Sequence, residues 1–206
     1  MFIRISRGFV IIVCLVSCFL PLLRSQQTAN QPAPTAPKKV LTPEQKVYQQ
    51  RSSEWMERHH ALQAQGKVIF DTEMAAEKAG DCPDANTTYD FNVCFGNAVT
   101  TADQRLKSFE QVIHDLQQPP PRMAGEPPEV TATGFAGPVL TSEQFSAEFD
   151  SVEQVWREYR TTACTAAFHQ FDGGTGGPSF EAQCELKLIR DHLRELDMIY
   201  GEVLHL

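Results

Sequence analysis

The cysteines are the residues whose spacing restricts the chemistry of this chain most. Two of the six lie within the first 25 residues, and the others are Cys82, Cys94, Cys164 and Cys184. None of these four belongs to a Cys-x-x-Cys pair, which argues against a structural zinc site or a thioredoxin-like redox centre. An even number of cysteines in an exported chain instead indicates disulfide bonds.

The other reactive side chains form no recognisable catalytic set. The six histidines, including His59 and His60, do not reach the i, i+4 spacing of metal ligands together with a second ligand set, so we expect solvated surface histidines. Carboxylates are abundant, but no Ser-His-Asp arrangement or activated cysteine accompanies them. The glycine-rich segment 173–177 lacks the Lys-Ser/Thr of a phosphate-binding loop and follows no strand. We therefore predict a protein that is not an enzyme and has no catalytic residue, cofactor or metal.

The first 25 residues have the pattern of a secretory signal. Arg4 and Arg7 precede an apolar stretch from Gly8 to Leu23, which at about 16 residues is short for a bilayer span of roughly 20. Cleavage after Ser25 and simple secretion are the first expectation. The run ending in Cys18 resembles the lipobox of bacterial lipoproteins, in which that cysteine is acylated. Membrane attachment is thus expected only through a lipid anchor or an uncleaved signal.

The charge of the chain restricts its partners. The full sequence has 26 acidic and 18 basic residues and a net charge of −8. Removing residues 1–25 takes away three arginines and no acid, so 15 basic groups face 26 acidic ones, a net charge of −11. Basic residues nowhere cluster, which excludes the usual footprint of a nucleic-acid-binding protein. An acidic surface favours a basic protein partner, mainly through encounter rate and specificity.

The chain after the signal begins with a tether and a polar helix. Residues 26–41 are rich in Gln, Pro, Ala and Thr and have almost no apolar residue to anchor them, which indicates a flexible tether. A helical extension is expected over residues 42–80, with Thr42 as its cap. We expect Gly66 to interrupt this helix.

Three further helices are predicted from apolar residues that recur at steps of three and four. A capping box of Thr87 and Asp90 opens the first of them, and the prolines 119–121 end it. The next helix starts at Thr141 or Ser142. The expected buried stripes consist of Phe95, Ala98, Ala102, Leu106, Phe109, Ile113 and Leu116, then Phe145, Phe149, Val152, Trp156, Tyr159 and Ala163, and finally Leu186, Ile189, Leu193, Leu196, Tyr200 and Val203.

The segments between these helices define the architecture. Residues 117–140 form a loop longer than compact domains usually use, which indicates mobility or function. The glycine-rich tract 172–178 joins the last two helices, and Ser179 is expected to cap the final one. No period-two strand pattern of useful length accompanies them. The predicted fold class is all-α: a small disulfide-stapled helical bundle of about four helices, the last two forming an antiparallel hairpin.

Four cysteines permit three pairings, and the helices favour one of them. Cys164 and Cys184 lie ten residues either side of Gly174, so an antiparallel hairpin places them opposite each other, within reach of a disulfide. Cys82 precedes the Thr87-capped helix and Cys94 lies about two turns inside it. A chain that folds back over the helix start can close that pair. We predict the disulfides Cys82–Cys94 and Cys164–Cys184.

Residues around the cysteines occur in a distinctive order: Asp81-Cys82 to Cys94, Asp103 and Leu106, Gln154, Trp156, Tyr159-Arg160 and Cys164, then Ala182-Gln183-Cys184, Leu188, Arg190 and Leu193. This order, from about Gly80 to Leu196, resembles the LprI-like lysozyme inhibitor domain family of bacterial envelope proteins. It departs from the family at Thr161, where aspartate is usual. The resemblance implies a secreted or lipid-anchored helical domain over residues 81–206, paired cysteines and, in the family's namesake, inhibition of lysozyme.

The remaining candidate residues have a structural and a functional interpretation. Trp156 and Tyr159 lie on the predicted apolar seam, which favours core packing over a recognition surface. Arg160 lies one step off that seam, and an ion pair with a carboxylate such as Asp103 is favoured over ligand binding. The glycine-rich turn is interpreted first as a permissive hairpin turn and second as a contact loop. Its residues are Gly173, Gly174, Thr175, Gly176 and Gly177.

Two functions from different classes remain open at this point. The first is an envelope binding module that engages a basic, lysozyme-type muramidase, an enzyme that works through paired carboxylates in a cleft. Either the glycine-rich turn or the loop 117–140 would then enter the cleft. The second is a structural or adaptor protein of the envelope without inhibitory activity.

Overall fold

The structure of the protein is a computed structural model that describes residues 40–127, 132–134, 137–171 and 173–205. Leu41 to Leu206 form one compact unit, and its elements are described here. The predicted signal, its lipobox cysteine Cys18 and almost all of the predicted tether lie outside the described residues. In the part of the chain that is described, no helix has the length and apolar character that crossing a membrane requires.

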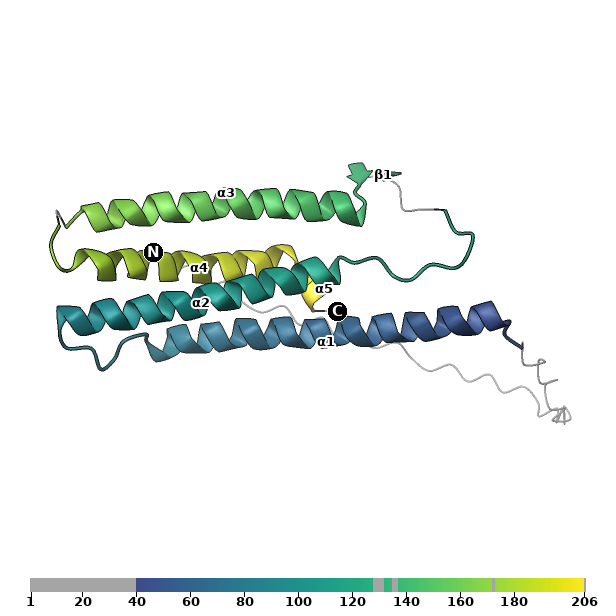
Figure 1. Ribbon diagram of the computed structural model, residues 1–206, viewed down its shortest axis with the longest axis horizontal. Coiled ribbons are helices and arrows are strands. Elements are labelled where there is room, and N and C mark those ends of the chain that lie inside the picture. The colour runs from purple at the N-terminus through teal and green to yellow at the C-terminus, as the bar shows by residue number, and fades with distance from the viewer. Residues whose placement is uncertain (1–39, 128–131, 135–136, 172, 206) are drawn as a thin grey trace, which may run out of the picture. The chain divides into compact units, whose positions relative to one another are not determined.

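The all-α fold class is confirmed. The long helices are α1 (Pro43–Ala79), α2 (Thr88–Leu116), α3 (Ser142–His169) and α4 (Gly177–Ile199), and a single turn, α5 (Gly201–Leu204), follows α4. The chain runs up and down through α1, α2, α3 and α4, so α1 with α2 and α3 with α4 form antiparallel hairpins (Figure 1). Helices α2 and α4 pack together in the middle, with α1 against α2 and α3 against α4.

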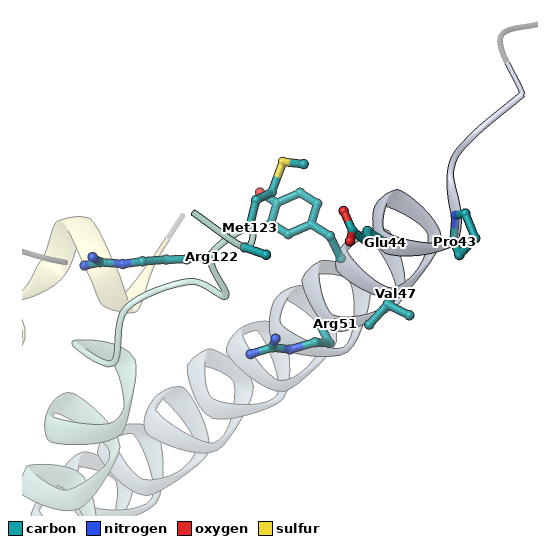
Figure 2. A pocket seen from close by; sticks show the side chains of 8 residues that line it. Pro43, Glu44, Val47, Arg51, Arg122 and Met123 are labelled. Atoms are coloured by element: carbon teal, nitrogen blue, oxygen red, sulfur yellow. The ribbon is translucent and has the colours of Figure 1, made fainter. Parts of the chain in front are cut away.

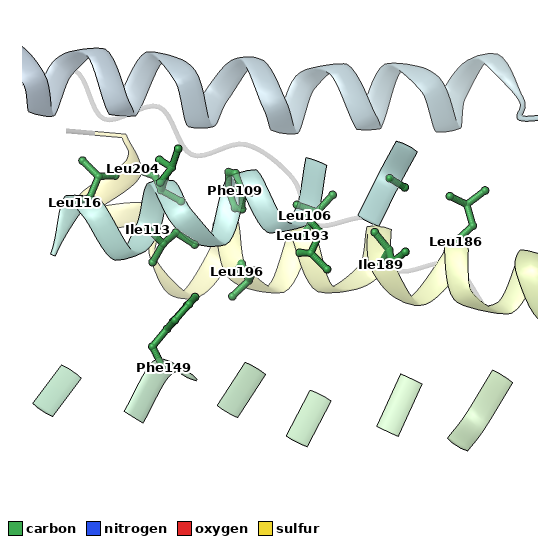
Figure 3. Close-up of a cluster of buried hydrophobic side chains, with 12 residues drawn as sticks. Leu106, Phe109, Ile113, Leu116, Phe149, Leu186, Ile189, Leu193, Leu196 and Leu204 are labelled. Atoms are coloured by element: carbon green, nitrogen blue, oxygen red, sulfur yellow. The ribbon is translucent and has the colours of Figure 1, made fainter. Parts of the chain in front are cut away.

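The central helices supply most of the core. Apolar side chains at steps of three and four on α2 and α4 face each other, and Figure 3 shows how they interdigitate. Removing them from water is the main favourable term in folding. The buried apolar residues are Ala102, Leu106, Phe109, Val112, Ile113, Leu116, Phe149, Leu186, Ile189, Leu193, Leu196 and Leu204.

Helix α1 continues through Gly66, so the predicted interruption there was wrong. Gly66 is buried at a close approach of α1 to the core. A Cβ at this position would lie 3.2 Å from Cδ2 of Leu204 and 3.3 Å from Cγ1 of Val112. The glycine therefore allows the helices to pack closely at this point. Glycine by itself disfavours a helical backbone, so the surrounding residues of α1 must hold Gly66 in the helix.

Helix ends follow their local capping chemistry in three cases and depart in the fourth. Thr42, Thr87 and Thr141 each cap a helix by accepting a hydrogen bond from the backbone N–H three residues later. The prediction that Ser179 caps α4 was wrong, because the helix begins earlier, at Gly177. The Ser179 hydroxyl instead donates to the carbonyl oxygen of Gly176 at 2.9 Å. Pro178 is compatible with this earlier start, because it lies in the first turn of α4. Backbone N–H groups in a first turn have no acceptor within the helix, so proline loses no hydrogen bond there.

The buried face of α3 is partly polar where an apolar seam was expected. Phe149 is buried as predicted, but Val152 and Tyr159 are 56% and 58% exposed. Glu153 is buried, 2% exposed, and the stripe continues through Trp156 to the buried Cys164. A prediction that counts only apolar residues misses this face because charged side chains occupy part of it.

The long connection between α2 and α3 contains a short hairpin. Strands β1 (Ala132–Gly134) and β2 (Gly137–Val139) pair antiparallel, although no strand was predicted. Before them, the chain runs beside the N-terminal half of α1. A pocket of about 310 Å³ lies there, and Figure 2 shows Arg122 and Met123 on one side of it and Val47 and Arg51 on α1.

Candidate functional site

Two connections meet at one end of the bundle. The α1–α2 connection, residues 80–87, and the α3–α4 connection, residues 170–176, both lie at the end opposite the long loop (Figure 1). The Asn92 side-chain amide, in the second turn of α2, donates a hydrogen bond to the carbonyl oxygen of Thr175 at 3.1 Å and so links the start of α2 to the α3–α4 connection. We call residues 81–94 together with 170, 171 and 173–180 the disulfide end.

The disulfides are Cys82–Cys94 and Cys164–Cys184, the pairs expected from the sequence. Their Cα atoms are 6.0 Å and 5.4 Å apart. The first bond holds the α1–α2 connection against α2, and the second joins α3 to α4 at the base of their hairpin. Both restrict the unfolded chain and hold the two connections in place.

The glycines of the α3–α4 turn allow its backbone to pack closely against phenylalanine residues. Gly173 has a φ of +78°, a conformation that other residues rarely adopt. A Cβ at Gly174 would lie 2.9 Å from the carbonyl oxygen of Phe171, and one at Gly177 would lie 3.0 Å from the Phe168 ring. The ring of Phe171 packs in turn on Phe180, with centroids 4.2 Å apart. These glycines thus have a structural reason for their presence.

Beside the first disulfide, a pocket of about 500 Å³ combines apolar and acidic groups. Tyr89 and Val93 line it from α2 and are 75% and 45% exposed. Asp81, Asp84 and Asp90 also line it. Hydrogen bonds from the Thr87 side chain and backbone hold the pKa of the Asp90 carboxyl below its usual value, so it is ionised at neutral pH. An exposed aromatic ring among carboxylates suits a basic protein surface.

Behind this pocket, a buried ion network ties three segments together. The Arg190 guanidinium on α4 donates from Nε to Glu73 Oε1 at 2.8 Å and from Nη1 to Asp81 Oδ2 at 2.8 Å, and its Nη2 also binds Asp81. Arg105 Nη1 donates to the second Glu73 oxygen at 2.6 Å. Burial alone would lower the pKa of Arg190, but its bonds to Asp81 and Glu73 outweigh burial and raise that pKa. The network fixes the position of Asp81, and hence of the adjoining Cys82.

Sequence reasoning assigned no role to Glu73 or Arg190. Glu73 lies on α1 four residues after Ile69 and three after Phe70, and both of those residues pack against the core. A carboxylate at a core position of a helix is a signal for a buried ion pair. Arg190 lies beside Ile189 on the buried stripe of α4 and carries the same signal.

Arg160 and Asp103 form the pair that the sequence suggested. Arg160 Nη1 donates to Asp103 Oδ1 at 2.8 Å, and Lys107 Nζ lies 2.6 Å from the other Asp103 oxygen. Burial alone would raise the pKa of Asp103, but the bonds from Lys107 and Arg160 lower it. The Arg160 guanidinium also lies 5.2 Å from the centroid of the Trp156 ring. The pair connects α2 to α3.

A second polar cluster joins α2, α3 and α4 and consists of Glu110, Glu153 and His192. His192 Nε2 lies 2.9 Å from Glu153 Oε2, and its Nδ1 lies 3.2 Å from Glu195 Oε2. Arg157 Nη2 donates a hydrogen bond to Glu110 Oε2. His192 is 4% exposed, so the expectation of solvated surface histidines was wrong for this residue. The error arose because Glu153 and Trp156, which contact the His192 ring, lie on another helix, where sequence spacing does not reveal them.

Burial and a hydrogen bond with Glu153 raise the pKa of Glu110 to about 7. Burial acts in the same direction on Glu153, but the hydrogen bond from His192 outweighs it and lowers the pKa of Glu153. The two carboxylates therefore differ: Glu153 is ionised, and Glu110 holds a proton for much of the time near neutrality.

The model of the family described as Lysozyme inhibitor LprI matches residues 79–196, more than half of the chain. The chain belongs to the LprI lysozyme inhibitor family. The LprI match contains both disulfides, the acidic pocket and the Glu110–Glu153–His192 cluster. It leaves out α1 except for its last residue, and with it Glu73 and Gly66. No curated protein and no solved structure matches this chain.

The aromatic residues of the LprI-like motif have different environments. Trp156 is half-buried, and its ring stacks on His192 with centroids 4.0 Å apart and an interplanar angle of 11°. Tyr159 is exposed on the outer side of α3, so its expected place in the core was wrong. At about 100° per residue, Tyr159 lies roughly 120° around α3 from the buried Glu153 and therefore faces away from α4.

Substitution of Trp156 tests this packing. We expect Trp156→Ala to lower the free energy of unfolding by about 2–3 kcal/mol, less than the ~3–5 kcal/mol of a fully buried tryptophan. The loss arises from the stacking on His192 and from the packing of the Trp156 ring against the core. Urea denaturation followed by far-ultraviolet circular dichroism measures it, and Tyr159→Ala is the control, expected within about 0.5 kcal/mol of the wild type. A Trp156 variant as stable as that control would contradict the packing.

Proposed function

We propose that this LprI family member is a secreted or lipid-anchored binding module of the cell envelope that inhibits a lysozyme-type muramidase without acting as an enzyme. The observation that carries the proposal is the family match over residues 79–196. In this proposal residues 1–25 direct export, with Cys18 as the alternative point of acylation. Residues 26–41 are the tether, 42–80 the helical extension and 81–206 the binding domain.

We propose the disulfide end as the surface that meets the enzyme. Tyr89 offers a large exposed aromatic side chain, the type that most often contributes strongly to protein interfaces. The carboxylates of Asp84 and Asp90 lie in the same pocket and complement a basic enzyme. The disulfides hold both connections in place, so binding would order few groups and lose little entropy. The turn Gly173–Gly177 is part of this surface, and the Asn92 side chain on α2 binds the carbonyl oxygen of Thr175 within it.

The loop 117–140 is the weaker candidate for the contact. Its described residues lie at the other end of the bundle, so they and the glycine-rich turn cannot both enter one cleft (Figure 1). Neither disulfide adjoins it, and its first part lies against α1, where Arg122 and Met123 line a pocket with Val47.

Replacement of Tyr89 tests the inhibitor proposal. Tyr89→Ala should weaken lysozyme binding by about 30-fold, since loss of a central aromatic contact costs about 2 kcal/mol. Its matched control is Tyr159→Ala, another exposed tyrosine, which lies on α3 and should leave affinity unchanged. Surface plasmon resonance and a cell-wall turbidity assay measure binding and inhibition.

Raising the salt concentration should slow association far more than it accelerates dissociation, because exposed charges are screened over about 8 Å at physiological ionic strength.

The alternative is an adaptor of the envelope that holds another protein along α3. Val152, Val155 and Tyr159 are all more than half exposed and recur at steps of three and four, which makes an apolar stripe on the outer side of α3. The same two variants separate the proposals. No binding to any lysozyme at low salt, together with a native fold, would contradict the inhibitor and leave the adaptor.

A further inference from the structure

We propose that Glu110, Glu153 and His192 form a binding site for one divalent transition-metal ion of the zinc class, which would tie α2, α3 and α4 together. One ligand atom from each residue can be chosen so that all three lie within 4.8 Å of one another. Ligands of a tetrahedral zinc ion lie about 3.3 Å apart, so small side-chain rotations bring the three to their positions. The site is independent of the proposed contact with lysozyme.

His192 is oriented as a metal-binding histidine. Its Nδ1 faces Glu195 at 3.2 Å, and its Nε2 faces Glu153 at 2.9 Å. When a metal ion replaces the Nε2 proton that Glu153 accepts, Nδ1–H donates to Glu195 and the Nε2 lone pair is directed at the ion. Such a carboxylate behind the ring is typical of zinc-binding histidines. The stacked Trp156 ring holds the imidazole plane in place.

Glu110 supplies an observation that an ion network alone does not explain. The residue is 8% exposed and its Oε2 binds Arg157, but when Glu110 is ionised its buried Oε1 has no hydrogen-bond partner. Its hydrogen bond with Glu153 exists only while one of the two carboxyls holds a proton. An unsatisfied buried acceptor costs about 1–3 kcal/mol. A metal ion would satisfy this oxygen. Arg157 is 37% exposed along its side chain and can turn towards solvent as a cation enters.

The cluster is accessible to an ion. Glu110 and Glu153 line a pocket of about 300 Å³, together with Gln111, His114 and Asp150. His114 lies one helical turn after Glu110, and its buried Nδ1 has no hydrogen-bond partner. The pocket thus has room for a fourth ligand, either water or His114. A site of one histidine and two carboxylates with few ligands favours zinc or cobalt over calcium, which needs six to eight oxygens.

Metal titration of the purified chain with its disulfides intact tests the site. Isothermal titration calorimetry with Zn²⁺ should give one ion per chain, and the visible absorption of bound Co²⁺ should report a nitrogen and oxygen ligand set. Glu110→Gln, which keeps the shape of the side chain, should weaken the affinity for Zn²⁺ at least about 100-fold, and Glu195→Gln about 10-fold, since it only supports His192. Circular dichroism establishes that each variant is folded.

The neighbouring histidines His59 and His60 on α1, which are not part of the cluster, provide the control. The double variant His59→Ala, His60→Ala should bind Zn²⁺ as the wild type does. Loss of binding in this control, unchanged affinity in a folded Glu110→Gln variant, or no heat of binding to the wild type would each overturn the proposal. A folded Glu153→Gln variant with lost binding would support it further, and Glu110→Gln decides the matter if Glu153→Gln does not fold. None of these outcomes depends on binding to lysozyme.

Discussion

Replacing Arg190 with methionine is expected to lower the free energy of unfolding by about 3–5 kcal/mol, the usual cost of removing one partner of a buried ion pair. Arg190 is 5% exposed and binds both Glu73, 1% exposed, and Asp81. Its removal leaves Asp81 without this partner and Glu73 with Arg105 alone. Loss of the interaction should also loosen the chain around Cys82. Urea denaturation of the oxidised protein measures the change.

The same two helices supply a matched control one turn away. Arg194 on α4 binds Glu77 on α1, as Arg190 binds Glu73, but the side chains of Arg194 and Glu77 are 42% and 38% exposed. Because solvent screens this pair, Arg194→Met should change the stability by less than about 1 kcal/mol. If Arg190→Met and Arg194→Met lower the free energy of unfolding equally, the prediction is contradicted, because burial would then not set the strength of these ion pairs.

Removing α1 should abolish cooperative unfolding, although α1 lies almost wholly outside the LprI match. A chain that begins at residue 79 loses Glu73 and exposes the surfaces of Phe109, Val112 and Leu204 that pack on Gly66. Leu62, Ile69, Phe70 and Met74 also leave the core. Their combined loss exceeds the roughly 5–15 kcal/mol that stabilises a typical domain. The expected product retains helical circular dichroism but has a broad thermal transition and binds hydrophobic dyes.

A chain that begins at Val40 is the control for this truncation. It keeps all of α1 with its Thr42 cap and should unfold in one sharp transition. If the chain beginning at residue 79 unfolds as sharply and with similar stability, α1 is an accessory helix and the matched region folds on its own. Calorimetry of both chains at one concentration, with free thiols counted to verify the disulfides, distinguishes these results.

Local chemistry explains why much of the fold could be predicted. The capping boxes at Thr42, Thr87 and Thr141 and the stripes of α2 and α4 act over three or four residues, so the sequence displays them directly. The pairing Cys164–Cys184 followed from the symmetry of a hairpin about Gly174. The Arg160–Asp103 pair followed from the place of Arg160 one step off the apolar seam.

The wrong predictions were those that depend on which helix packs against a given face of another helix. Gly66 was expected to break α1, and only the approach of Val112 and Leu204 shows why a glycine lies inside a continuous helix. Tyr159 was placed in the core because its residue type fits the periodicity, but α3 contacts α4 through a stripe that contains Glu153. Apolar periodicity cannot locate a face whose buried residues are partly charged.

The polar clusters were decided by the tertiary structure alone. One cluster joins Arg190 to Glu73 and Asp81, which both lie more than a hundred residues before it in the sequence. The other brings together Glu110, Glu153 and His192 from three different helices. Sequence spacing reports which residues share a face of one helix, but it carries no record of which faces meet. Residue types and helix periods therefore determined the class of fold, the disulfides and the acidic character of this chain. The packing of α2 between α1 and α4 decided which charges became buried partners, because burial removes the water that would otherwise solvate them.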